Sequence, residues 1–394
     1  MNKKEKTLEK IKILLLIVIV ILLLLNFMQK NGIIDNIQNT SRKLLNNGET
    51  ILEDGGVAKT VNASNWDTNK VTVTRDADGK EVPVPKGYVG SNVAGENKIN
   101  EGYVIYEGTA TVDSSNVASA RTSRNQWVWI PVPYPDRIYE EANGIKKAKL
   151  YTYANSGRSE YKNNNYEPAI LPEADTTTNL TNGGLSGMTQ DKLYQELQKE
   201  FDSTMESIEK YGGFYIGRYE TGNLSQTKPV VKKMNTDISN QTWYKMYSKM
   251  GYLAANSNVK TNMIWGCLFD ETLQWLVDRS NKSYADISND SKTWGNIDDS
   301  TFTYNNGSSN VTKATNTSVK IPTGSTNYTK ALNIYDLTGN VWEWTLEGTG
   351  TSCRVLRGAG NGSTSRWSTS ARNSIHATST AGTGYGCRAY LYIK

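Results

Sequence analysis

An unbroken run of aliphatic residues near the start of the chain, residues 13–25, most limits what the sequence can fold into. The uncharged stretch continues to residue 29, and as a helix it is about 25 Å long, slightly shorter than the roughly 30 Å hydrocarbon core of a bilayer. Lys12 and Lys30 flank it, and their long side chains can reach the headgroups. No small-residue cleavage site follows, so the pattern favours an uncleaved transmembrane anchor over a signal peptide.

The charges around residues 13–29 predict the orientation of this anchor in the membrane. The first 12 residues hold five lysines and two glutamates, which supply +3 of the chain's net charge of +5. Basic residues before the span place the N-terminus in the cytoplasm and the rest of the chain outside the cell. Because that remainder is close to neutral, the sequence predicts a single-pass protein of the cell membrane and no nucleic acid partner.

Composition divides the chain into three parts. Residues 1–30 are the basic start and the anchor, and residues 31–67 are a polar stalk with scattered aliphatic side chains. Residues 68–394 are interpreted as one large domain. Within this domain, residues 280–329 are dominated by Asn, Ser and Thr, and such a long insertion is either functional or loosely ordered.

Many strands and a few helices are expected in the domain. Alternation on both sides of Asp78 and Gly79 predicts a hairpin. An apolar stripe at helical spacing predicts a helix that Thr189 caps and Gly212 ends. Further strands are expected at 101–108, 126–133 and 212–221 and near the C-terminus, and further helices at 240–250 and 268–277. A few helices among many strands indicate an α+β fold.

Histidine and cysteine are too scarce for many kinds of metal or nucleophilic site. The chain has one histidine, His376, and three cysteines, Cys267, Cys353 and Cys387, with no spacing typical of a zinc site. An odd number of cysteines gives no disulfide framework. Cys353 and Cys387 could pair across strands, but buried free thiols are the favoured interpretation.

Four motifs stand close together near the C-terminus. They are "YDLTGNVWEWT" from Tyr335, "RVLRGAGN" from Arg354, "SARN" from Ser370 and "YGCRAYLY" from Tyr385. Together they resemble the closing pattern of the formylglycine-generating-enzyme (sulfatase-modifying factor) family. The match covers about residues 100–394 and is most specific at the C-terminal end. The resemblance implies an irregular α+β fold that is a variant of the C-type lectin fold.

The same resemblance implies that the domain is catalytically silent. The family's catalytic cysteines lie shortly after an R-G-G-S element, and here the segment from Gly358 to Ala371, "GAGNGSTSRWSTSA", has no cysteine. The related iron-dependent sulfoxide synthases need several histidines, and this chain has one. An enzyme is therefore the least favoured class of function.

The resemblance also implies a structural calcium ion in the turn of the first motif. In the family the ion binds a side chain, two backbone carbonyls and a carboxylate. The matching groups here are the Asp336 side chain, the carbonyls of Gly339 and Val341, and the Glu343 carboxylate, and Ca²⁺ prefers such oxygen ligands. An alternative without a metal has Asp336 capping the turn and Glu343 pairing with an arginine such as Arg388.

A binding surface is expected in the irregular segment between the last core strands, residues 361–384, because lectin variants expose this part of the fold. The segment is small and polar, and its candidate ligand contacts are Asn361, Arg366, Trp367, Asn373 and His376. A lone tryptophan among serines and threonines is typical of a rigid anchor for a ligand, and it is equally typical of a lid over the core. The expected partner is a protein or a glycan outside the cell.

The leading hypothesis is a membrane-tethered extracellular recognition protein with a silent sulfatase-modifying-factor-like domain. One alternative comes from a second resemblance. The target proteins of diversity-generating retroelements use the same lectin variant, with patches rich in Asn, Ser, Thr, Arg, His and Tyr, and residues 361–376 have that composition. A structural subunit of a surface assembly is another alternative. An enzyme that uses Asp336 and Glu343 as its carboxylates is the third.

Overall fold

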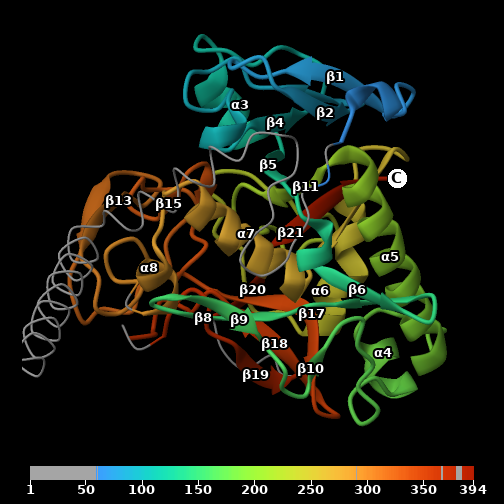
Figure 1. Cartoon of the computed structure of the whole chain (residues 1–394). Coiled ribbons are helices and arrows are strands. Elements are labelled where there is room, and N and C mark those ends of the chain that lie inside the picture. Colours follow the sequence, from blue (N-terminus) through green and yellow to red (C-terminus); the bar gives the residue numbers. More distant parts are fainter. Residues whose placement is uncertain (1–58, 60, 290, 365–366, 379–383) are drawn as a thin grey trace, which may run out of the picture. The chain divides into compact units, whose positions relative to one another are not determined.

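Sheet predominates in the fold, with a few helices packed against it, as seen in a computed structural model (Figure 1). The structure describes residues 59, 61–289, 291–364, 367–378 and 384–394, which belong to a compact unit that begins at Lys59. Within this part of the chain, no helix is long and apolar enough to cross a membrane. The anchor predicted over residues 13–29 lies outside the described residues.

A six-stranded antiparallel sheet forms the centre of the unit. In spatial order its strands are β12 (Val259–Met263), β21 (Ala389–Ile393), β11 (Gly213–Gly217), β5 (Gln126–Pro131), β4 (Val104–Glu107) and β3 (Tyr88–Gly90). Every residue of β11 and of β21 is buried, so both faces of the central strands are covered. A side chain at Gly213 would meet the carbonyl oxygen of Ile130 at 2.2 Å, and this glycine therefore permits the close approach of β11 and β5.

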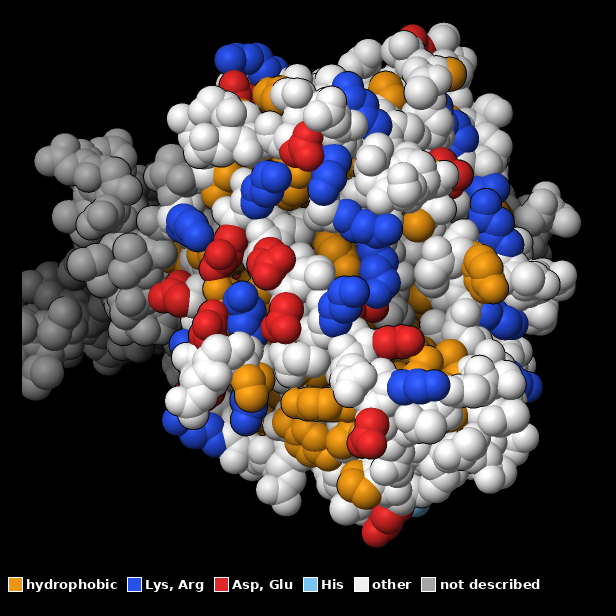
Figure 2. Space-filling view, turned by 90° about the vertical axis from the view of Figure 1, so that its right-hand side faces the viewer, with side chains coloured by type: hydrophobic (Ala, Val, Ile, Leu, Met, Phe, Trp, Pro, Cys, Tyr) orange, Lys and Arg blue, Asp and Glu red, His pale blue; other side chains and the backbone are white. Residues whose placement is uncertain are grey.

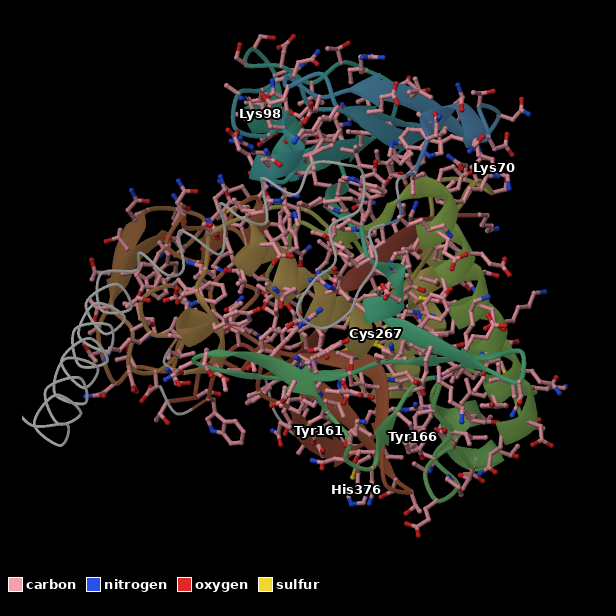
Figure 3. All side chains as sticks on the ribbon, viewed as in Figure 1. Lys70, Lys98, Tyr161, Tyr166, Cys267 and His376 are labelled. Carbon is pink, nitrogen blue, oxygen red and sulfur yellow. The ribbon has the colours of Figure 1, made fainter. Side chains whose placement is uncertain are left out.

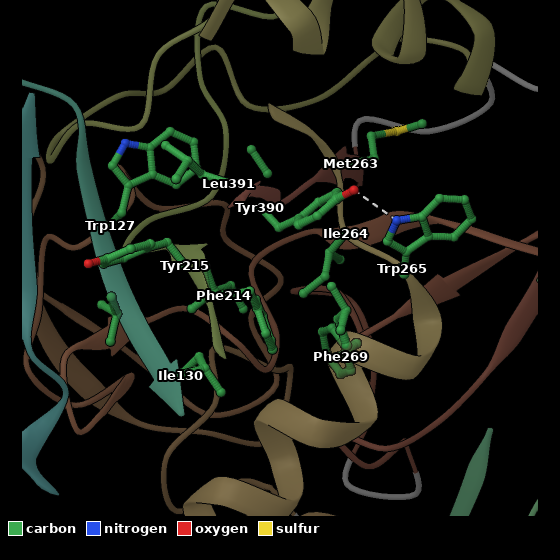
Figure 4. Close-up of a cluster of buried hydrophobic side chains, with 14 of the residues drawn as sticks. Trp127, Ile130, Phe214, Tyr215, Met263, Ile264, Trp265, Phe269, Tyr390 and Leu391 are labelled. Carbon is green, nitrogen blue, oxygen red and sulfur yellow. Dashed lines mark hydrogen bonds between the residues drawn. The ribbon is translucent and has the colours of Figure 1, made fainter. Parts of the chain in front are cut away.

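Aromatic side chains fill the space between this sheet and the helices (Figure 4). The Trp265 indole N–H donates a hydrogen bond of 2.8 Å to the hydroxyl of Tyr390, which lies on β21. The ring of Phe201 meets Trp265 edge to face, with centroids 5.0 Å apart. The hydrogen bond satisfies the indole N–H of Trp265 inside an apolar core.

Three longer helices cover the sheet, and they agree with the predicted ones. They are α5 (Gln190–Tyr211), α6 (Trp243–Met250) and α7 (Gly266–Asp278). The Thr189 side chain accepts the Lys192 N–H at the start of α5, and Gly212 ends this helix with a φ of 84°. Shorter helices are α3 (Val117–Ser123), α4 (Thr177–Asn182) and α8 (Tyr284–Ser288).

A second sheet contains most of the C-terminal motifs. Its path is β10 (Asn165–Tyr166), β17 (Trp342–Thr349), β18 (Cys353–Arg357) and β19 (Asn373–His376), with β20 (Tyr385–Cys387) parallel to β17. The strand β19 pairs only with β18 and is an edge of this sheet. All three cysteines are free thiols, and Cys267 and Cys387 are buried.

Five hairpins complete the strands. They are β1–β2 (Val71–Arg75 and Glu81–Pro85), β6–β7 (Tyr139–Ala142 and Ile145–Ala148), β8–β9 (Tyr151–Ala154 and Gly157–Glu160), β13–β14 (Phe302–Asn305 and Asn310–Lys313) and β15–β16 (Lys330–Ala331 and Ile334–Tyr335). The first is the hairpin predicted around Asp78 and Gly79. On the face shown in Figure 2, positive and negative side chains lie interspersed.

The Asn/Ser/Thr-rich insertion, residues 280–329, contains the helix α8 and the hairpin β13–β14. Two of its own residues, Trp294 and Ile297, are buried. The Lys313 ammonium group is also buried and donates to the carbonyls of Ile297 and Ser300, each at 2.8 Å. A buried ammonium group with several carbonyl partners fixes the backbone around it, so the described part of the insertion is integrated into the core.

Candidate functional site

The predicted binding segment follows β18 and returns along the edge of the second sheet as β19. Of its five candidate contacts, Asn361, Trp367 and Asn373 are half-buried and His376 is exposed. Arg366 lies outside the described residues. The His376 side chain stands at the outer edge of the molecule (Figure 3). The structure therefore places four of the five candidates in one segment after β18.

Buried polar residues hold the backbone of this segment. Ser363 and Thr369 are buried, and the Thr369 N–H donates to the Ser291 hydroxyl at 3.3 Å. The Ser370 N–H donates to the carbonyl of Ile287 at 3.2 Å. The segment is thus attached to the insertion that carries α8, and its framework side chains point inward.

Arg372 fixes the segment more firmly, because its side chain is only 7% exposed. Its guanidinium donates to Glu347 at 2.9 Å, to Asp270 at 2.5 Å and to the carbonyl of Tyr151 at 2.6 Å. Arg357 bonds the other oxygen of Asp270 at 2.7 Å. Charge-assisted bonds of this kind are stronger than neutral ones, so Arg372 positions β19 and does not face a ligand.

Trp367 packs on the core motif. Its ring meets that of Trp342 edge to face, with centroids 5.4 Å apart and planes at 84°. Trp342 lies at the start of β17 and is 9% exposed, whereas Trp367 is half-buried. Trp367 therefore covers Trp342 and still presents ring surface to solvent, which combines the two interpretations that the sequence left open.

The turn predicted to bind calcium is fully buried. Asp336 adopts a positive φ of 57°, and its carboxylate accepts hydrogen bonds from the Thr323 hydroxyl (2.8 Å), the Gly324 N–H (2.7 Å) and the Thr329 hydroxyl (2.6 Å). Burial raises the pKa of Asp336, and these three donors oppose the shift. Asp336 thus caps the surrounding loops.

Glu343 forms a two-bond pair with Arg388. The guanidinium donates to its two oxygens at 2.6 and 3.1 Å, and both side chains are at most 1% exposed. Arg388 also donates to the carbonyls of Gly217 and Tyr335, at 3.0 and 2.9 Å. Burial raises the pKa of Glu343 to about 7, although the guanidinium acts in the opposite direction.

A third carboxyl group, Glu220, lies beside this pair, and no sequence motif singled it out. It accepts bonds from the Asn340 side-chain amide at 2.6 Å and the Val341 N–H at 3.2 Å. Burial, followed by the charges of Asp336 and Glu343, raises its pKa well above the ordinary value. Of these three buried acidic groups, Arg388 hydrogen-bonds only Glu343, but its positive charge acts to lower the pKa values of all three, against the effect of burial.

The calcium ligands predicted from the sequence were the side chains of Asp336 and Glu343 and the carbonyls of Gly339 and Val341. The contacts above involve the two carboxylates of this set. A calcium ion takes six to eight oxygen ligands, but here protein donors use the oxygens of both carboxylates. Among the described residues, no group of three or more His, Cys, Asp or Glu side chains is placed to hold a metal. The arrangement matches the alternative in which Asp336 caps the turn and Glu343 pairs with Arg388. The calcium ion stays a prediction, and the following experiment tests it.

Calcium removal gives that test. Because the carboxylate oxygens already have protein partners, we expect EDTA to leave the melting temperature of the full-length protein unchanged within about 1 °C. An ion that binds only the folded state would stabilise it by mass action. If the melting temperature instead rises by several degrees in about 1 mM CaCl₂, does not rise in MgCl₂ and falls again on adding EDTA, a calcium site is established.

Another buried cluster of polar groups lies at the start of α7, and no sequence motif predicted it. Glu167 accepts the backbone N–H groups of Gly266 and Cys267 at 2.5 and 3.0 Å. Burial, with the nearby charge of Glu347, raises the pKa of Glu167 to about 8. Burial also raises the pKa of the Cys267 thiol well above its ordinary value. A protonated, buried thiol is inert as a nucleophile, so this cluster is structural.

Comparison with known proteins adds no assignment. No known protein family matches the chain, and no curated protein shows significant similarity to it. The resemblance to formylglycine-generating enzymes therefore depends on sequence motifs alone, chiefly the C-terminal ones. The structure adds where those motifs lie, namely in the strands β16 to β21 and in the loops between them.

Proposed function

We propose that this protein is a membrane-tethered extracellular recognition protein, and that the segment after β18 is its binding face. The face comprises Asn361, Trp367, Asn373 and His376. The supporting observation is that the segment contains two kinds of side chain, buried ones that hold its backbone and others that reach the surface. Residues such as Thr369 point inward and hold the backbone, while other polar side chains remain at the surface.

This division suits binding better than catalysis. A fixed backbone reduces the entropy that a surface loses when it captures a ligand. A half-buried tryptophan, Trp367, offers rigid apolar area, and the neighbouring serines, threonines and asparagines offer adaptable hydrogen bonds. The carboxylates of the predicted turn, Asp336 and Glu343, are buried and have protein partners, which does not favour a role in attacking a substrate.

The finer fold assignment is part of the same proposal. We assign the domain to the C-type-lectin-like fold of formylglycine-generating enzymes, in a form without the catalytic cysteines. The four C-terminal motifs support this, together with the pairing of β21 beside β11. The anchor at residues 13–29 supports the cell membrane as the location. Calcium at Asp336 and Glu343 is not needed for the proposed activity.

Replacing Trp367 tests the binding face. The full-length protein in detergent micelles is applied to immobilised glycans and to purified cell-envelope fractions. We expect the Trp367→Ala variant to lose about tenfold or more in affinity for whichever probe the unmodified protein binds. Aromatic side chains at the centre of an interface contribute much of the binding free energy, and truncation to alanine removes that contribution. The readout is the dissociation constant from surface plasmon resonance.

Two controls separate binding from folding in this experiment. Tyr252 is 57% exposed and lies in the short helix Gly251–Leu253, so Tyr252→Ala removes an exposed ring elsewhere and should bind normally. Thermal unfolding of each variant shows whether the contact of Trp367 with Trp342 matters for stability. Unchanged affinity in both Trp367→Ala and His376→Ala would remove this segment as the binding face.

A further inference from the structure

A groove of about 410 Å³ opens in the N-terminal part of the unit, and no motif of the sequence indicated it. It lies between the hairpin β1–β2, the strand β3 and the loops near Asn92 and Thr111. Its volume is within the lower range of small-molecule sites. The strands β1 to β4 gather at one end of the described unit, and β18 and β19 lie at the opposite end (Figure 1). The groove is therefore separate from the binding face.

The hydroxyl of Tyr103 is the most informative group in the groove. Tyr103 lines the groove and is only 2% exposed. Burial, with the charge of Asp76, raises its pKa to about 12, so the phenol stays neutral. No hydrogen bond joins this hydroxyl to any described residue, and its oxygen is not one of the fully buried polar atoms, so it reaches the space of the groove. A hydroxyl that faces a groove without a protein partner can donate to, or accept from, a ligand atom or water.

Gly90 provides the space for this hydroxyl. A Cβ atom at position 90 would lie 1.9 Å from the Tyr103 oxygen. The φ angle of Gly90 is not positive, so its backbone does not require a glycine. Gly90 therefore leaves room for the Tyr103 hydroxyl, and an alanine at position 90 would displace that hydroxyl.

The charged groups of the groove are already committed. Arg75 pairs with Glu81 at 3.1 Å, and its side chain is 70% exposed. The Asp76 carboxylate accepts the backbone N–H groups of Lys80 (2.8 Å) and Ile99 (2.9 Å), which fixes the hairpin. The Asp76 carboxylate is thus used by the backbone, and Arg75 is mostly exposed to solvent, so the described lining of the groove presents no buried charge that would favour an ion.

Uncharged donors and acceptors make up much of the remaining lining. The side chains of Thr74, Asn92, Asn97 and Thr111 face the groove, and none of them hydrogen-bonds to another described residue. Hydroxyl and amide groups both donate and accept hydrogen bonds. The ring of Tyr88 and the side chain of Val84 add apolar surface. A ligand with many neutral hydroxyl groups and some apolar carbon–hydrogen surface matches this set, and a sugar ring has both.

We propose that this groove binds a small neutral carbohydrate, with the Tyr103 hydroxyl as a central contact. The site is independent of the proposed binding face around Trp367, and either site can fail without the other. A chain with both sites would hold two ligands at opposite ends of one unit.

Sugar binding to defined variants tests the proposal. The full-length protein is prepared in a detergent without a sugar headgroup and titrated with glucose, galactose, mannose, N-acetylglucosamine and their disaccharides. Saturation-transfer NMR detects contact, and calorimetry gives the affinity. We expect at least one neutral sugar to bind. Tyr103→Phe should weaken it about three- to tenfold, as expected for one lost hydrogen bond, and Gly90→Ala should abolish binding.

The chain offers a matched control for each change. Tyr194→Phe removes a hydroxyl that is exposed on α5, and Gly251→Ala adds a methyl group where nothing lies within 4 Å. Both should bind the sugar normally. Circular dichroism melts confirm that each variant folds, and Tyr103→Phe keeps the test valid if Gly90→Ala does not fold.

Several outcomes would overturn the proposal. One is that none of the sugars binds, and another is that Tyr103→Phe binds with full affinity. Tighter binding of glucuronic acid than of glucose would contradict the uncharged character assigned to the groove. Sugar binding that is lost in Trp367→Ala but kept in Gly90→Ala would move the carbohydrate to the face after β18. Binding kept in Trp367→Ala and lost in Gly90→Ala supports the groove.

Discussion

Replacing Arg388 by alanine is expected to lower the free energy of unfolding by about 3–5 kcal/mol, the usual cost of leaving a buried charge without its partner. Arg388 is fully buried and holds both oxygens of Glu343, together with the carbonyls of Gly217 and Tyr335. Its removal leaves a carboxylate and two carbonyls unsatisfied inside the fold. Urea unfolding of the full-length protein in detergent micelles measures the loss.

A second substitution and a surface control make this prediction specific. Adding Glu343→Gln to Arg388→Ala removes the stranded charge, so the double variant should recover part of the lost stability. Arg75→Ala removes an arginine whose side chain is 70% exposed, and it should change stability by no more than about 0.5 kcal/mol. A loss below about 1 kcal/mol in Arg388→Ala would contradict the buried pair.

The folded protein should lose stability as the pH rises from about 5 to about 8. Burial and Glu347 raise the pKa of Glu167 from 4.5 to about 8 in the fold, so in this window the folded state binds a proton that the unfolded chain has released. Stability then falls with increasing pH, and at about 1.4 kcal/mol per pKa unit the loss amounts to a few kcal/mol. Glu343, with its pKa raised to about 7 by burial, acts in the same direction.

Glu167→Gln isolates the main source of this pH dependence. The amide cannot ionise, so the variant should show a flatter stability profile between about pH 5 and about pH 8 than the unmodified protein. Glu140→Gln, on the exposed strand β6, should keep the full slope. The measurement is the urea midpoint at each pH. A flat profile in the unmodified protein would show that Glu167 does not retain its proton.

Acid has the opposite effect through Glu96. Burial alone would raise the pKa of this carboxyl group, but the guanidinium groups of Arg218 and Arg121 lower it to about 2. Its contribution to stability is present above about pH 4.5 and is lost as the pH falls toward 2. The two kinds of buried carboxyl group therefore place the stability maximum near pH 5.

Local signals explain which elements the sequence predicted well. The helix α5 begins after Thr189 and ends at Gly212, as predicted, because a cap and a terminal glycine act through neighbouring residues. The helix predicted from residue 240 begins instead at Trp243, because the Thr242 side chain caps it by accepting the Lys245 N–H. The apolar stripe on which the prediction rested also starts at Trp243, so it agrees with the observed boundary.

Non-local contacts explain what the sequence could not predict. Nothing around Arg372 in the sequence indicates that Asp270 and Glu347 will surround it. The groove depends on Tyr103 and Gly90, which are separated along the chain and meet only after β3 and β4 pair. The pairing of Glu343 with Arg388 was foreseen as an alternative, because both residues belong to recognisable motifs.

The position of β21 has a consequence for how the chain folds. Ala389–Ile393 pairs with β11 on one side and with β12 on the other. The strand β11 ends at Gly217, so a long stretch of chain must be synthesised before its partner exists. Pairing between distant segments slows folding, and until β21 arrives both neighbours present open edges that can pair with other chains. A chain that stops short of residue 389 should therefore aggregate or be degraded, because its largest sheet is left in two pieces.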